Sequence, residues 1–212
     1  PNGIWATSQP VYFDDFIANE QSRYEYWRQK SVAHRDFADS QPNIGHTLLA
    51  QWEAAGRLQA VITQNIDGLH QLAGSSRVIE LHGTARQIAC LQCEQRYDAE
   101  PMVQQFLEMD QVPSCEQCGG MLKHATISFG QSLQPEVLEE AMTLARTADF
   151  LLVLGSSLVV EPAASLPRLA KQQGARVVIV NRDETPQDKD ADQVFHEGLG
   201  AALGAFNDWL EK

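Results

Sequence analysis

The chain has 212 residues, with 16 Lys and Arg against 28 Asp and Glu, which gives a formal net charge of −12 at pH 7. Its 43% hydrophobic and 21% charged residues are ordinary for folded domains and exclude wholesale disorder. The negative charge disfavours nonspecific binding to nucleic acid or anionic lipid, and no segment approaches the roughly 20 apolar residues that span a bilayer.

Hydrophobic patterning predicts helices and short strands along most of the chain. Residues 11–43 are rich in aromatic and charged side chains, which indicates a small helical segment. An amphipathic pattern predicts a helix over Ile44–Ala55. The later elements, in chain order, are strand Leu58–Thr63, strand Arg77–Leu81, helix Glu100–Met109, helix Pro135–Arg146, strand Asp149–Leu154, helix Ala163–Gln172, strand Arg176–Val180, strand Gln193–Phe195 and helix Leu199–Leu210.

The predicted strands are continuously apolar rather than alternating, which is typical of parallel strands buried on both faces. Strand–helix alternation in the second half indicates βαβ units. We therefore expect an α/β fold with a doubly wound, Rossmann-like parallel sheet. The predicted domains are a Rossmann-like domain over 1–10, 56–87 and 124–212, a helical insertion over 11–55, and a smaller cysteine-bearing module over 88–123.

The four cysteines form two pairs, Cys90-x-x-Cys93 and Cys115-x-x-Cys118, with 21 residues (94–114) between the pairs. Each pair can present two thiolates from one tight turn, and two such turns close a tetrahedral shell. The spacing predicts a structural zinc ion held by all four cysteines. Redox dithiols or disulfides are the alternative.

Polar residues follow four of the predicted strands. Ligands of open α/β sheets bind beyond the carboxyl ends of the strands, where amides and hydroxyls bind ribose and backbone N–H groups bind phosphate. The pattern predicts an adenosine diphosphate-type ligand. Taken singly, each group has a plainer explanation as a turn, a cap or a hydrogen-bonded loop histidine. The groups are Gln64-Asn65-Ile66-Asp67, His82, Gly155-Ser156-Ser157 and Asn181-Arg182.

Taken together, these motifs resemble the sirtuin family of NAD-dependent protein deacylases, from Pro1 to about Leu203. The motifs that carry the resemblance are Thr63-Gln64-Asn65-Ile66-Asp67-Gly68-Leu69-His70, Glu80-Leu81-His82-Gly83, the two cysteine pairs, Ser128-Phe129-Gly130, Gly155-Ser156-Ser157-Leu158 and Val180-Asn181.

The sequence departs from the family pattern at three places. The family opens with a strand and a Gly-Ala-Gly-x-Ser loop on the NAD pyrophosphate, and we expect the natural protein to carry that segment before Pro1. The usual Phe-Gly-Glu is Phe129-Gly130-Gln131, and the usual Gly-Thr-Ser is Gly155-Ser156-Ser157. In addition, no tyrosine has an arginine three positions on, a pair that marks members preferring acidic acyl groups.

The resemblance implies a transfer of acyl groups, most often acetyl, from protein lysines to ADP-ribose, which yields nicotinamide, O-acyl-ADP-ribose and free lysine. It implies that His82 is the general base and that Asn65 is catalytic. The residues implied to bind NAD are Gln64, Asn65, Ile66, Asp67, Gly155, Ser156, Ser157, Asn181, Arg182 and Leu199. Those implied to bind the acyl-lysine peptide are Ile127, Phe129, Gly130, Leu158, Val159 and Val160, although apolar residues of this kind are ordinarily core.

Two other functions fit the same residues. ADP-ribosyl transfer or NAD hydrolysis would use the same pocket. A non-catalytic zinc-ribbon binding module would use only the cysteines. We expect acyl-lysine proteins or peptides as partners, neither nucleic acid nor membrane, and a monomer. The reduced cysteine pairs and the lack of a secretory signal predict an intracellular, cytoplasmic protein.

Overall fold

The computed structural model describes residues 9–210, apart from the side chains of residues 36–38. Its internal contacts divide the chain into two compact units. Unit 1 holds residues 9–40, Asn65–Gly68 and His82–Leu133, and unit 2 holds Gln41–Gln64, Leu69–Leu81 and 134–210. Among these residues, no helix combines the length and the apolar character needed to cross a membrane.

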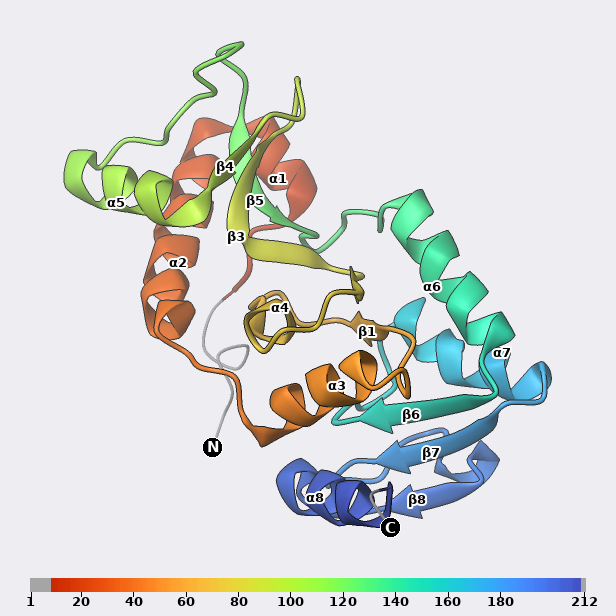
Figure 1. Ribbon diagram of the computed structural model, residues 1–212. Helices are drawn as coiled ribbons and strands as arrows, with labels where there is room; N and C mark the ends of the chain where they lie inside the picture. The colour runs from red at the N-terminus through yellow and green to blue at the C-terminus, as the bar shows by residue number, and fades with distance from the viewer. Residues whose placement is uncertain (1–8, 211–212) are drawn as a thin grey trace. The chain divides into compact units, whose positions relative to one another are not determined.

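Unit 1 contains a three-stranded antiparallel sheet in the order β4-β3-β5 (Figure 1). Helices α1, α2 and α5 accompany this sheet, and aromatic side chains from all three fill the core around it. Trp27 is fully buried, and its indole Nε1 donates to the carbonyl of Leu122 at 3.0 Å. The elements are α1 (Phe13–Ala18), α2 (Glu20–Ala38), β3 (Gly83–Cys90), β4 (Arg96–Asp98), α5 (Ala99–Met109) and β5 (Leu122–Thr126).

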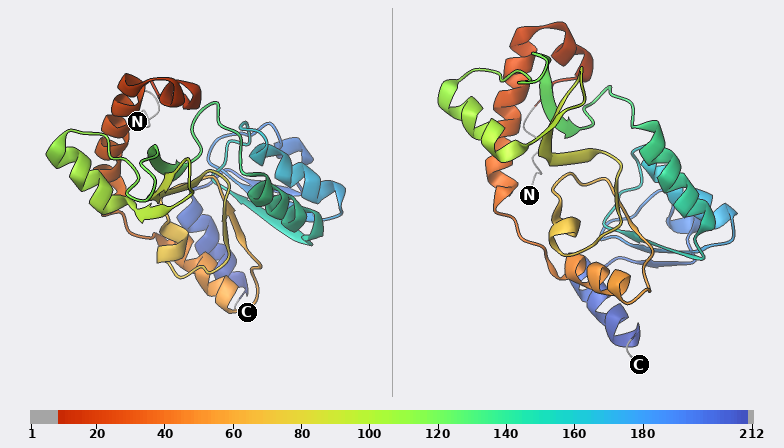
Figure 2. Two further views of the ribbon diagram at one scale, coloured as in Figure 1. Left: turned by 90° about the horizontal axis from the view of Figure 1, so that it is seen from above. Right: turned by 45° about the horizontal axis from the view of Figure 1, so that its top comes forward.

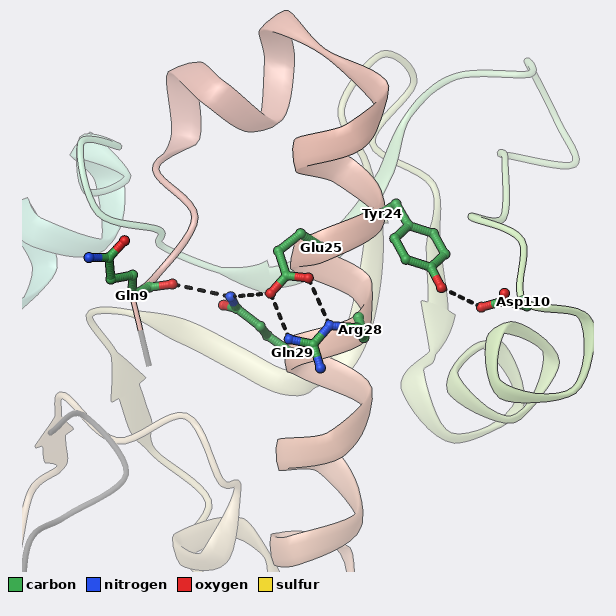
Figure 3. Close-up of polar contacts among 6 residues, drawn as sticks. All are labelled: Gln9, Tyr24, Glu25, Arg28, Gln29 and Asp110. Atoms are coloured by element: carbon green, nitrogen blue, oxygen red, sulfur yellow. Dashed lines mark hydrogen bonds and ion pairs between the residues drawn. The ribbon is translucent and has the colours of Figure 1, made fainter. Parts of the chain in front are cut away.

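Polar contacts hold the exposed side of α2 in place (Figure 3). Arg28 donates two hydrogen bonds of 2.7 Å to the carboxylate of Glu25 on the preceding turn. Gln29 donates to the same carboxylate and to the carbonyl of Gln9. The hydroxyl of Tyr24 donates to Asp110, the left-handed residue that caps α5, at 2.6 Å. This last bond ties α2 to α5 from the solvent side.

Unit 2 contains five parallel strands in two hydrogen-bonded groups, β1-β2 and β6-β7-β8. Figure 2 shows α3 beside α8, and α6 beside α7. The strands are β1 (Val61–Thr63), β2 (Val78–Glu80), β6 (Phe150–Leu154), β7 (Arg176–Val180) and β8 (Gln193–Phe195). The helices are α3 (Ile44–Ala54), α4 (Leu69–Leu72), α6 (Pro135–Thr147), the 3₁₀ turn η2 (Ala163–Ser165), α7 (Leu166–Gln172), the 3₁₀ turn η3 (Asp188–Asp190) and α8 (Leu199–Leu210).

Strand β6 shows why this unit is doubly wound. Val153 packs into a core cluster with α6 and α7, whereas Leu152 and Leu154 pack against a second cluster formed by α3 and α8. Successive side chains of a strand point to opposite faces, so helices cover both faces of this sheet. This arrangement explains the continuous hydrophobicity of the strand sequences.

The predicted elements of unit 2 are present, with corrections at their ends. Strands β7 and β8 and helix α8 match the predicted bounds, while β1 and β2 are three residues each, shorter than predicted. Leu81 lies outside β2, yet it is buried and its N–H donates to the carbonyl of Thr63 at 2.9 Å. The predicted helix Ala163–Gln172 begins with the 3₁₀ turn η2.

The antiparallel sheet of unit 1 was not predicted. It begins at Gly83, before the zinc module predicted for 88–123, and ends at Thr126. The helical residues predicted as one insertion over 11–55 fall in both units, since α1 and α2 pack with the cysteine-bearing segment and α3 packs with α8. The division of the chain into three domains stays a prediction.

Candidate functional site

The four cysteines of unit 1 come together as one metal-type cluster. Their Sγ atoms all lie within 4.8 Å of one another, with Cys90 3.5 Å from Cys118 and Cys93 3.6 Å from Cys115. A zinc ion with Zn–S bonds of about 2.3 Å holds its sulfurs about 3.8 Å apart. The thiolates therefore fit a tetrahedral zinc ion that uses every ligand position, which is typical of a structural site.

Tight turns present these sulfurs. Glu94 and Gly119 follow the second cysteine of each pair and have positive φ values of 60° and 73°. A Cβ on Gly120 would lie 2.9 Å from the sulfur of Cys90, so only glycine fits there. The hydroxyl of Tyr97 lies 3.2 Å from the sulfur of Cys115 and lowers the pKa of that thiol to about 6. A low pKa favours the thiolate, the form that binds metal.

A second set of polar residues lies in unit 1 where Asn65–Gly68 runs beside the start of β3. The N–H of Ala85 donates to the carbonyl of Ile66 at 2.8 Å, and Arg86 Nε donates to the carbonyl of Asp67 at 2.5 Å. The side chain of Asn65 is exposed, while Ile66 and Asp67 are half-buried. The backbone of the segment implied to form a nicotinamide pocket is thus tied to the start of β3.

His82 is half-buried and immediately precedes Gly83 in unit 1. Its carbonyl accepts from the N–H of Ile127 at 2.9 Å, which joins it to the segment after β5. Gly83 has φ +69°, and a Cβ there would lie 2.0 Å from the carbonyl oxygen of Ala125. The close approach of β3 to β5 therefore requires glycine beside His82.

The apolar residues implied to bind acyl-lysine in unit 1 lie on the segment that leaves β5. Ile127 is half-buried, and Phe129 is 50% exposed in a turn with Gly130, whose φ is +81°. An aromatic ring left this exposed is not core, so the plainer interpretation of Phe129 as a buried core residue is wrong.

Unit 2 gathers polar residues at the carboxyl ends of its strands. Gln64 follows β1, and its Nε2 donates to Oγ of Ser156, which follows β6, at 3.4 Å. The N–H of Gly155 donates to the carbonyl of Val180 at 2.9 Å, and the N–H of Asn181 donates to that of Phe195 at 3.1 Å. Amides and hydroxyls at such an edge are the donor set that an adenosine diphosphate ligand needs.

Gly155 makes the turn at this edge. Its φ is +61°, and a Cβ would lie 3.1 Å from Cδ1 of Leu199 at the start of α8. The structure thereby brings Gly155, Ser156, Gln64 and Leu199 together, as a nucleotide cradle requires. Ser157 and Arg182 are exposed, and Arg182 lies 3.6 Å from the carboxylate of its neighbour Asp183.

The residues implied to hold peptide in unit 2 are of two kinds. Val159 and Val160 are 62% and 52% exposed, whereas Leu158 is buried in the core with α6 and α7. Leu158 has φ +53°, and its N–H donates to Oγ of Ser156 at 3.3 Å. Any peptide contact at this position therefore depends on its backbone, since its side chain is core.

Two features of unit 1 were missed by sequence reasoning. Arg86 holds the 65–68 segment through the carbonyl of Asp67. The sequence indicated this residue only as a positive charge four positions after His82. Lys123 and His124 are 1% and 2% exposed on β5, and burial lowers the pKa of Lys123 to about 7 and that of His124 to about 3. Polar side chains in a strand ordinarily face solvent, so the sequence did not predict that Lys123 and His124 are buried.

Comparisons with known proteins decide the family. The profile described as "Sir2 family" matches residues 1–162. The chain belongs to the Sir2 family. A Sir2-family relative named "NAD-dependent protein deacetylase" from Rhodopseudomonas palustris is 41% identical over 97% of this chain and 82% of its own length. "NAD-dependent protein deacetylase 1" of Bradyrhizobium diazoefficiens is 44% identical over the same shares.

Solved Sir2 structures confirm the α/β, Rossmann-like fold class. The structure titled "Sir2-p53 peptide-NAD+" has a TM-score of 0.88 and 36% identity, over 97% of this chain and 84% of that one. The structure titled "Sir2 bound to acetylated peptide" has a TM-score of 0.88 and 36% identity, over 95% and 83%. The predicted sirtuin resemblance is therefore confirmed, while the roles of the individual site residues stay predictions.

Proposed function

We propose that this Sir2-family chain removes acyl groups, acetyl above all, from lysine side chains of proteins, with NAD as co-substrate. The observation that carries the proposal is the edge of unit 2 where Gln64, Gly155, Ser156 and Leu199 meet, in a chain whose relatives are named NAD-dependent protein deacetylases. The donor set at this edge matches the ribose and phosphate groups of NAD.

NAD bound there supplies the ADP-ribosyl group that accepts the acyl group as nicotinamide leaves. The chain's own residues have separate tasks. Asn65, Ile66 and Asp67 of unit 1 form the nicotinamide pocket, and Arg86 keeps their backbone in place through the carbonyl of Asp67. Ser156, Ser157, Asn181 and Arg182 of unit 2 hold the adenosine side.

His82 is the general base that takes a proton from a ribose hydroxyl. Histidine suits this task because its ordinary pKa lies near working pH. The N–H of Ile127 donates to the carbonyl of His82 and so fixes the main chain at the proposed base. Asn65 is the proposed second catalytic residue.

The substrate is an acyl-lysine in an extended peptide. In unit 1, Ile127 and Phe129 are the proposed apolar contacts for the lysine stem, and Gly130 is a proposed backbone contact for the peptide. In unit 2, Val159 and the backbone of Leu158–Val160 are separate proposed contacts, and main-chain hydrogen bonds of this kind give affinity with little sequence preference. The absence of a Tyr-x-x-Arg pair supports neutral acyl groups, since Tyr24 is followed by Trp27 and Tyr26 by Gln29.

The structural zinc held by the four cysteines keeps the fold of unit 1 and takes no part in the reaction, because its shell has no open position. We further propose that the protein is a cytoplasmic monomer that binds neither nucleic acid nor membranes. Sedimentation at two protein concentrations and cell fractionation test these points.

The deciding experiment incubates the full-length protein with NAD and an acetyl-lysine peptide. We expect free lysine peptide, nicotinamide and O-acetyl-ADP-ribose in equal amounts. NAD consumption without peptide would instead indicate a hydrolase, and ADP-ribose on a protein acceptor would indicate a transferase. No turnover of NAD under any of these conditions would favour a non-catalytic zinc-ribbon module.

A further inference from the structure

Phe129, the proposed wall for the acyl-lysine stem, stands half-exposed on a turn of unit 1. A ring on an exposed turn meets a ligand in one place only if the backbone of the turn is fixed. We propose that Gln131 is a positioning residue that fixes Phe129 for the acyl-lysine side chain. This inference rests on the function proposed above.

The turn is closed by two hydrogen bonds between the same two residues. The N–H of Gln131 donates to the carbonyl of Ser128 at 3.0 Å, and the N–H of Ser128 donates back to Oε1 of Gln131 at 3.0 Å. Phe129 and Gly130 are the two central residues, and the φ of +81° at Gly130 suits the third position of a type II turn. The Gln131 side chain thus closes a hydrogen-bonded turn that contains Phe129.

A second anchor comes from α1. The N–H of Phe13, the first residue of the helix, donates to the carbonyl of Phe129 at 2.9 Å. The first N–H groups of a helix have no partner within the helix, so this bond satisfies one of them. The Tyr12 ring centroid lies 6.0 Å from that of Phe129.

The same segment is tied to the proposed base, because Ile127 donates to the carbonyl of His82 two residues before Phe129. Fixing the turn therefore fixes the proposed acyl-lysine wall relative to the backbone of His82 within unit 1. If the side-chain bond of Gln131 is lost, the turn becomes mobile and binding must order it again. That cost falls on peptide affinity and leaves NAD affinity unchanged.

The test compares Gln131→Leu with Gln131→Glu. Glutamate keeps an oxygen where Oε1 accepts from Ser128, whereas leucine has the size but no acceptor. A neutral hydrogen bond corresponds to about a three- to tenfold change in a binding constant. We expect Q131L to raise the KM and the Kd for an acetyl-lysine peptide by that factor, with kcat and the KM for NAD unchanged. Q131E should restore wild-type values.

Phe13→Pro tests the second anchor without breaking α1. Proline is accepted at the first helical position, and Tyr12 already has the extended ψ of 156° that a residue before proline adopts. The change removes the N–H that binds Phe129, and Phe13→Leu controls for the lost ring. We expect F13P, but not F13L, to weaken peptide binding as Q131L does.

Amide hydrogen exchange supplies a readout that does not depend on turnover. Exchange at Ser128 should accelerate in Q131L and stay slow in Q131E. Wild-type peptide affinity in Q131L, or equal losses in Q131L and Q131E, would overturn the inference. If the wild-type protein binds the acetylated peptide but never deacetylates it, the proposed function fails while the Kd comparison still decides the role of Gln131. If the wild-type protein binds no acetylated peptide, both the proposed function and the proposed role of Gln131 are wrong.

Discussion

Gln64 Nε2 donates to Ser156 Oγ at 3.4 Å and so joins the end of β1 to the end of β6, two strands that belong to different hydrogen-bonded groups of unit 2. Ser156 Oγ also accepts from the N–H of Leu158, whose φ is +53°. One hydroxyl therefore connects the two strand ends and shapes the turn after β6.

We expect Ser156→Ala to weaken NAD binding by about three- to tenfold, because a donor or acceptor for the ligand is lost and the turn loses its internal bond. Calorimetric titration of NAD measures the change. Ser165→Ala is the matched control, since Ser165 bonds to Glu161 away from the strand ends. Equal NAD affinity in both variants would remove Ser156 from the proposed cradle.

His82→Ala should lower kcat for deacetylation by about 10²- to 10⁴-fold, the usual contribution of a general base. The bond to Ile127 comes from the backbone of residue 82, so the variant keeps it. Zinc content and denaturant unfolding check that the fold is intact. Full turnover in this variant would show that another group takes the proton.

Cys90→Ser should release zinc and destabilise unit 1 by several kcal/mol, because the binding energy of a structural zinc ion is folding energy. Metal analysis and urea unfolding measure both effects. Ser114→Ala lies next to Cys115 without supplying a ligand and should retain the metal. A metal-free C90S protein as stable as wild type would contradict a structural role.

Gly83→Ala should destabilise the protein by more than about 3 kcal/mol, since a Cβ would lie 2.0 Å from the carbonyl oxygen of Ala125, a backbone atom of the paired strand β5. Gly56 has nearly the same φ, +70°, with nothing within 4 Å. Gly56→Ala should therefore cost only about 1 kcal/mol of backbone strain. Comparable losses in the two variants would show that the approach of β3 to β5 is adjustable.

His124 makes unit 1 sensitive to acid. Burial, with smaller contributions from Lys30, His34 and Lys123, lowers its pKa to about 3, and neither ring nitrogen has a hydrogen-bond partner among the described residues. Because the unfolded chain binds this proton at the ordinary pKa of about 6.5, stability falls as pH drops from about 6.5 towards 3. Protonation of carboxylates also lowers the stability of the folded protein in acid. The prediction therefore concerns the difference in stability between the wild type and a variant that lacks His124.

His124→Leu should be more stable than wild type, and its advantage should grow as pH falls through that window. Urea unfolding at pH 7, 5.5 and 4.5 measures the difference. A constant difference across these pH values would show that the histidine does not titrate with folding.

The sequence was sufficient for features that depend on local order along the chain. Strands β7 and β8 and helix α8 match their predicted bounds, and the buried strand β7 and the amphipathic helix α8 leave a direct hydrophobic signature. The sheet β4-β3-β5 has no such hydrophobic signature in the sequence. Its strand β3 has irregular burial, and β5 buries Lys123 and His124, so both strands look polar in sequence.

Some residues of the candidate site could be predicted from sequence and others could not. Gln64, Ser156 and Asn181 could be predicted because each comes within two residues of the end of a recognisable strand. The bracing role of Arg86, the turn closed by Gln131 and the burial of Leu158 depend on which backbone groups lie opposite them in space. A linear pattern carries no information on those partners.

The sequence by itself determined the family, the cysteine ligands and the strand-end polar residues, because these depend on residue type and spacing. Only the tertiary structure decided that Gly83 is required by a carbonyl of β5, that Phe129 is held at its carbonyl by the first N–H of α1, and that a lysine and a histidine are core residues. The physical reason is that close approach, burial and hydrogen-bond partnership arise between residues far apart in the chain, where packing outweighs local propensity.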